Sequence, residues 1–202
     1  MNINQAVTKF RASLPNGFEL RGMGMEEFKP LFQENHLKVF ADKARVDVRA
    51  IFTEDEALRL KALGEHYGTP LCFRFGIFKD NHFVGWHIGD QKSPEEFYMR
   101  NSGILPEFQG KGLYTAMLNP IMNFLKECGF QVISSKHNAT NNRVIVPKLK
   151  AGFVITGLEI SDKFGTMVRL EHFTNPVRRE IVDYRCGQAM PSETTRPLLG
   201  LG

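Results

Sequence analysis

The 202-residue chain has few cysteines, no long apolar run and no block of charge of one sign. Its three cysteines, Cys72, Cys128 and Cys186, lie far apart and form no CxxC pair, which excludes a disulfide framework and the usual zinc spacings. We therefore expect reduced thiols, no metal site and a cytoplasmic location. No stretch approaches about 18 apolar residues and the N-terminal segment has no apolar core, so we expect neither a membrane span nor a signal peptide.

The charge that is present is mild and dispersed. The chain carries 26 Lys and Arg against 22 Asp and Glu, a formal net charge of +4. Such a balance suits an acidic small-molecule ligand, and without a basic cluster we do not expect nucleic-acid binding. Hydrophobic residues make up 42% of the chain, with 17 phenylalanines against one tryptophan, which indicates one compact domain with a phenyl-rich core.

Apolar periodicity predicts a mixed α/β (α+β) chain in which an antiparallel half joins a βαβ half. Predicted strands lie near 17–23, on both sides of the turn 79–82, at 95–105 and 130–135, and in a hairpin over 153–173. Predicted helices lie within 25–44 and at 53–68, 113–129 and 141–153, the second of them with a capping box of Thr53 and Glu56. We expect a single domain over 1–175. The periodicity is lost after it, so 176–202 is predicted to be an extension or tail that packs on the domain or on a partner.

The junction of the two halves carries the most informative stretch, GILPEFQGKGLYTAML, residues 103–118. A strand ends at a proline, Gly110 and Gly112 flank Lys111, and an amphipathic segment follows at once. Glycines allow close backbone approach, and a helix N-terminus attracts anions, so this loop predicts a phosphate site. It lacks the Walker pattern and has only two glycines of the Rossmann fingerprint. An ordinary strand-to-helix turn is the plain alternative.

The stretch fits a third type of phosphate-binding motif better than the Walker or Rossmann motif. Residues 109–114, QGKGLY, match the Gln/Arg-x-x-Gly-x-Gly/Ala motif except at the last position, and Ile104-Leu105-Pro106-Glu107 precedes them. Downstream, Asn141 is followed eleven residues later by Gly152-Phe153. In these motifs and in element order over about 17–173, the chain resembles the GNAT superfamily of N-acetyltransferases.

The resemblance implies a largely antiparallel sheet flanked by helices, with a V-shaped splay between the fourth and fifth strands. It also implies acetyl-CoA as cosubstrate, with no metal, and direct attack on the thioester by a primary amine of an acceptor that the sequence does not identify. The cofactor contacts implied are Ile104, Leu105, Gln109, Gly110, Lys111, Gly112, Leu113, Tyr114, Thr115 and Asn141.

The catalytic residues depart from the family pattern. The family's tyrosine, which protonates the leaving thiolate, corresponds to Lys148, which is either a thiolate-stabilising group or a surface lysine at a helix C-terminus. Tyr114 is a second candidate acid, although core packing is its plainer role. Candidate bases are Glu96 and Tyr98, which share a strand face, and His87 on the neighbouring strand.

Three functions stay open at this point. An N-acetyltransferase agrees with both motifs. A catalytically silent acyl-CoA-binding regulatory or interaction module of the same fold would account for the missing tyrosine. A nucleotide-dependent oxidoreductase would need the partial Rossmann pattern to bind NAD(P). A homodimer also remains open.

Overall fold

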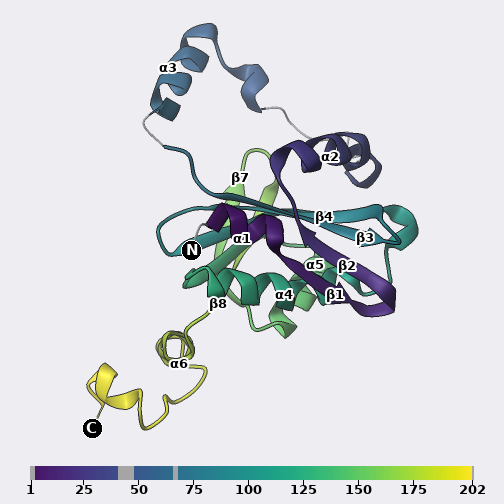
Figure 1. Ribbon diagram of the computed structural model, residues 1–202. Helices are drawn as coiled ribbons and strands as arrows, with labels where there is room; N and C mark the ends of the chain where they lie inside the picture. Colours follow the sequence, from purple (N-terminus) through teal and green to yellow (C-terminus); the bar gives the residue numbers. More distant parts are fainter. Residues whose placement is uncertain (1–2, 41–47, 66–67, 202) are drawn as a thin grey trace.

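The computed structural model describes residues 3–40, 48–65 and 68–201, which form one eight-stranded sheet with helices on both faces (Figure 1). The strand order is β1-β2-β3-β4-β5-β6-β8-β7. The strands are β1 (Arg11–Leu14), β2 (Phe18–Gly22), β3 (Cys72–Lys79), β4 (His82–Gln91), β5 (Glu96–Ile104), β6 (Val132–Asn138), β7 (Val154–Ser161) and β8 (Gly165–Phe173). The helices are α1 (Ile3–Lys9), α2 (Met25–Val39), α3 (Glu54–Glu65), α4 (Leu113–Glu127), α5 (Asn142–Lys150) and α6 (Pro176–Arg185).

The predicted antiparallel half is confirmed. Strands β3 and β4 form a hairpin whose two-residue turn, Asp80-Asn81, has φ values of 49° and 63°. Asp and Asn tolerate this left-handed conformation, which matches the twist of the flanking strands. Strand β5 then pairs antiparallel with β4, as the third aromatic-rich run predicts.

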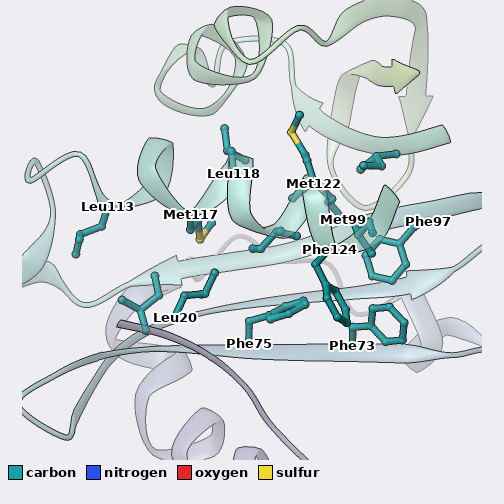
Figure 2. Close-up of a cluster of buried hydrophobic side chains, with 14 of the residues drawn as sticks. Leu20, Phe73, Phe75, Phe97, Met99, Leu113, Met117, Leu118, Met122 and Phe124 are labelled. Atoms are coloured by element: carbon teal, nitrogen blue, oxygen red, sulfur yellow. The ribbon is translucent and has the colours of Figure 1, made fainter. Parts of the chain in front are cut away.

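Two hydrophobic layers hold the helices on the sheet. On one face, α4 packs on the sheet: Leu113 lies above Leu20 of β2, and Phe124 packs against Phe73 and Phe75 of β3 (Figure 2). On the other face, α2 packs on a smaller cluster that includes Trp86. Complete burial of one such side chain contributes about 1.5–3 kcal/mol, so these layers fix the positions of α4 and β5 firmly.

The splay lies between β5 and β6, which correspond to the predicted fourth and fifth strands and are numbered one higher because β1 was not predicted. They form the parallel pair of the described sheet, and only Glu96–Tyr98 and Val132–Ser134 are in register. Strand β5 continues to Ile104 and β6 to Asn138 without further pairing to each other. The two strands therefore diverge toward the glycine loop, as the resemblance implies. A doubly wound parallel sheet, which the oxidoreductase reading requires, is not what these strands form.

The structure differs from the sequence-based prediction mainly at the two ends of the chain. Helix α1, strand β1 and helix α6 are absent from the sequence-based prediction, and α6 lies in the segment that the sequence predicts to be an extension or tail. Asn175 caps α6 by accepting hydrogen bonds from the N–H groups of Val177 and Arg178. The predicted helices reach into 41–44 and 66–67, which lie outside the described residues.

Helix α3 confirms its predicted capping box but has no buried residue. Thr53 N–H donates to Glu56 Oε2 at 2.8 Å and Glu56 N–H donates to Thr53 Oγ1 at 3.2 Å. Its leucines, Leu58, Leu60 and Leu63, are 49–69% exposed. Local sequence signals thus start this helix, while its apolar side chains contribute little to the buried core.

Candidate active site

The glycine loop has the conformation that a phosphate cradle needs. Gly110 and Gly112 both have φ of +74°, and a Cβ placed on either would meet no atom within 4 Å. Gly112 is also the N-cap of α4 and makes no side-chain cap bond, so the first N–H groups of that helix lack a capping acceptor. An open, left-handed loop that leads into a helix N-terminus is a favourable place for an anion.

A cavity of about 740 Å³ opens beside this loop, a volume typical of small-molecule sites. Most of the predicted cofactor contacts line it: Ile104, Gln109, Gly110, Gly112, Leu113, Tyr114 and Thr115. Three residues from α5, Arg143, Val144 and Pro147, also line it. The loop and the start of α5 therefore face one hollow, with a cation at its wall.

Three predicted contacts lie elsewhere. Leu105 is buried, Lys111 places its ammonium 4.9 Å from the centroid of the Phe108 ring, and Asn141 lines a second cavity. Gln109 lines the large cavity, but its Nε2 donates to the Ile104 carbonyl at 2.9 Å. This bond ties the loop back to β5 and gives Gln109 a structural role there.

The second cavity, of about 190 Å³, lies in the splay itself. Strand β5 contributes Met99–Ser102, β6 contributes His137 and α5 contributes Lys148. Ser102, Tyr114 and Val144 line both cavities, so the two adjoin. An extended ligand with its phosphates at the glycine loop would direct its other end toward Lys148.

Lys148 is 1% exposed, which rules out the surface-lysine interpretation. Its Nζ donates to Met99 Sδ at 3.2 Å and lies 4.4 Å from the centroid of the Phe153 ring. No ion pair joins it to a carboxylate among the described residues. Burial therefore lowers the pKa of Lys148 from 10.5 to about 7, close to the value that suits proton transfer at neutral pH.

His87 is fully buried, and its Nδ1 lies 2.8 Å from Ser102 Oγ. Burial, and then the charge of Lys148, lower the pKa of His87 to about 3. Burial and the charge of Lys148 also lower the pKa of His137 to about 3. Within the described chain, Nε2 of each ring has no hydrogen-bond partner. Both rings are therefore neutral at physiological pH.

The other candidates are placed less favourably. Glu96 lies at the closed end of the splay, where its Oε1 accepts from Ser134 Oγ at 2.5 Å and from Arg169 at 3.0 Å. Tyr98 belongs to the last parallel pair, and burial, with the nearby Glu159 charge, raises its pKa. Neither lines either cavity. Tyr114 lines both, but burial raises its pKa further above the ordinary value, which weakens it as an acid.

Sequence reasoning missed Arg143 and His137. It interprets residues 100–102 either as polar groups near the thioester or as an irregular strand end, and does not single out Ser102. Strand alternation could have found His137, because it shares a face with Ser135 on a strand that leads into the splay. Arg143 follows Asn141 closely enough to be placed at the same helix start. What the sequence does not give is the hydrogen bond between Ser102 and His87, because it depends on how β4 and β5 pair.

Two other kinds of site are absent from the part of the chain that the structure describes. No group of three or more His, Cys, Asp or Glu side chains is arranged to hold a metal ion there. No helix in those same ranges is long and apolar enough to cross a membrane.

Comparisons with known proteins agree with this geometry. The model of the acetyltransferase (GNAT) family matches residues 27–153, which include the loop, the splay and Lys148. No curated protein sequence is similar enough to count as a match.

Solved structures share the fold at low identity. yncA from Salmonella typhimurium, with acetyl-CoA, has a TM-score of 0.57 at 14% identity, covering 79% of this chain and 95% of that one. A GNAT acetyltransferase from Elizabethkingia anophelis, with acetyl-CoA bound, has 0.57 at 12%, covering 78% and 99%. Spermidine N-acetyltransferase from Vibrio cholerae, with CoA and spermine, has 0.54 at 15%, covering 78% and 95%. Because the family model covers more than half of the chain, this protein belongs to the GNAT acetyltransferase family.

Proposed function

We propose that the protein transfers an acetyl group from acetyl-CoA to a primary amine. One observation carries the proposal: two adjoining cavities run from a left-handed glycine loop, through a splayed strand pair, to a buried lysine. This arrangement matches the cofactor in order, because acetyl-CoA has a pyrophosphate, then a long pantetheine arm, then a thioester. The domain boundaries proposed with it are 1–175 for the acetyltransferase domain and 176–202 for an extension.

Binding would use the polar groups of the loop and the splay. N–H groups of 110–115 would hold the pyrophosphate, with the Arg143 charge on the opposite wall. The pantetheine amides would pair with backbone groups of β5 near Ile104, which β6 leaves unpaired beyond the third residue pair. Asn141, in the small cavity, would contact the end of the arm.

The chemistry would centre on Lys148. The amine nitrogen attacks the thioester carbon, a C–N bond forms and the C–S bond breaks, so that CoA leaves as a thiolate. Lys148 as an ammonium would donate a proton to that sulfur. A group with a pKa of about 7 serves this role better than Tyr114, whose phenol holds its proton more tightly.

The attacking amine must also lose a proton. Glu96 and Tyr98 lie outside both cavities, so either could act as the base only through water. His87 is engaged with Ser102, and burial makes it a weak base. Of the predicted catalytic residues, Lys148 therefore has the strongest support.

The test has two stages. Acetyl-CoA should raise the melting temperature, whereas pantetheine, which lacks the pyrophosphate, should do much less and NAD(P) nothing. A thiol-release assay over a panel of amines and peptides then tests transfer. Binding without release on the whole panel would favour the silent acyl-CoA-binding module, and no shift with acetyl-CoA would reject both.

The acceptor, the homodimer and the cytoplasmic location stay predictions. The outer strand β7 offers one place for a second copy, because Ile155, Leu158 and Ile160 are 56–90% exposed along an unpaired edge. Sedimentation of the purified chain would decide the oligomeric state.

A further inference from the structure

A hydrogen-bonded pair lies at the junction of the two cavities. His87 on β4 and Ser102 on β5 are cross-strand partners, so their side chains share one sheet face, the face on which Phe75 packs against Phe124 of α4. The His87 ring is fully buried and stacks on Phe75, with ring centroids 6.0 Å apart. The 2.8 Å contact between His87 Nδ1 and Ser102 Oγ is therefore held by the core on the histidine side.

The tautomer of His87 follows from its hydrogen bonds. If Nε2 carried the proton, a buried N–H donor would lack a partner within the described chain, at a cost of about 1–3 kcal/mol. That N–H would also lie in the field of Lys148, whose charge already opposes protonation of the ring. If Nδ1 carries the proton, it donates to Ser102 Oγ and Nε2 keeps a lone pair, which a nearby positive charge stabilises. The Nδ1–H form is thus preferred.

This tautomer decides what the serine hydroxyl can do. Ser102 Oγ accepts from His87, so its own O–H has to donate to a different atom. No other side-chain hydrogen bond involves Ser102 in the described ranges. Since Ser102 lines both cavities, its proton is available to an acceptor placed where they meet.

We propose that Ser102 donates a hydrogen bond to the carbonyl oxygen of the acetyl thioester, with His87 as the residue that positions it. The inference rests on the proposed function. Ser102 lies two residues, or about 7 Å along the strand, beyond Ile104 in the direction of Lys148. Lys148 would donate a proton to the sulfur, while Ser102 would donate a hydrogen bond to the carbonyl oxygen, whose negative charge grows as the amine attacks. No atom is transferred by Ser102.

Bound acetyl-CoA labelled with ¹³C at the carbonyl gives a direct test, because a hydrogen bond lowers the infrared C=O stretching frequency. We expect a lower frequency in the protein than in water, a return toward the free value in Ser102→Ala, and retention of the shift in Ser102→Thr. Ser135→Ala is the matched control, since Ser135 is a buried β6 hydroxyl that lines neither cavity. It should leave the frequency unchanged.

Two further variants test the positioning role. His87→Asn keeps a donor that can reach Ser102 and should keep most of the shift, whereas His87→Leu should lose much of it. With an amine found by the panel, Ser102→Ala should lower kcat about 100-fold with little change in KM for acetyl-CoA.

The outcomes separate this inference from the proposed function. If acetyl-CoA binds but Ser102→Ala leaves the carbonyl frequency unchanged, Ser102 is not the donor, and the acetyltransferase proposal stands. If acetyl-CoA does not bind the parent protein at all, both are overturned. A melting scan of each variant shows whether it is folded, and Ser102→Thr keeps the test valid if Ser102→Ala is unstable.

Discussion

Gly112→Ala tests the phosphate cradle at its centre. The added Cβ would meet no protein atom within 4 Å, so the folded chain has room for it. The backbone at φ of +74° disfavours any residue with a Cβ, at a cost of about 1–2 kcal/mol. Gly112 is the N-cap and not a residue of the helix interior, so the change gains none of the stability that alanine has over glycine within a helix.

The effect on binding should be much larger than this strain suggests. The new methyl group would occupy the space beside the loop N–H groups and push the pyrophosphate away from at least one of them. Loss of one hydrogen bond to a charged group costs about 1.5–3 kcal/mol, which corresponds to affinity for acetyl-CoA that is about 10- to 150-fold weaker. Calorimetric titration measures that change, and a melting scan measures the stability loss of about 2–8 °C.

Gly129→Ala is the matched control. Gly129 also has a positive φ, +101°, with open space around its Cβ position, but it follows the C-terminal end of α4, away from the cavities. It should lose similar stability and keep its affinity. If both variants bind acetyl-CoA as the parent does, the loop is only a turn and the proposed cofactor site is wrong.

Three further predictions concern charge and chain length. If Lys148 protonates the leaving thiolate, kcat should fall as the pH rises through about 7. In Lys148→Tyr that fall should move to higher pH, and an unchanged pH profile would contradict the role of Lys148 as the acid. The unfolded chain binds the Lys148 proton up to about 10.5, so the unfolding free energy of the parent should rise between pH 7 and 10.5. Lys148→Met, compared by denaturant titration, should lack that rise. A chain ending at Asn175 loses the exposed Arg178–Glu95 ion pair and the hydrogen bond from Arg179 to the Gly152 carbonyl. It should keep its affinity for acetyl-CoA. A large loss of affinity would show that residues 176–202 belong to the domain.

The sequence by itself determined the local structure and the cofactor class. Thr53 and Glu56 predict a helix start, Asp80-Asn81 predicts a hairpin, and the glycines of 109–114 predict a left-handed loop before a helix. Each signal depends on the conformational preference of a few neighbouring residues, which no distant contact needs to supply. The same locality explains why the loop motif identified the family.

Sequence signals did not predict two elements: one that forms by pairing with a neighbouring strand, and one whose charged composition hides its helical pattern. Strand β1 is four residues long and exists through its pairing with β2. Helix α6 has five charged residues among its ten, and its described contacts with the rest of the chain come mainly from arginines. Neither gives the strong apolar period by which elements are predicted.

The state of the catalytic groups was decided only by tertiary structure. From the sequence, Lys148 could equally be a solvated residue near a helix C-terminus. In the structure it is buried beside Met99 and Phe153. His87 meets Ser102 because β4 and β5 pair in one register, fifteen residues apart in the chain. A pKa or a tautomer is a property of the dielectric and of the partners around a group, and segments distant in sequence supply both.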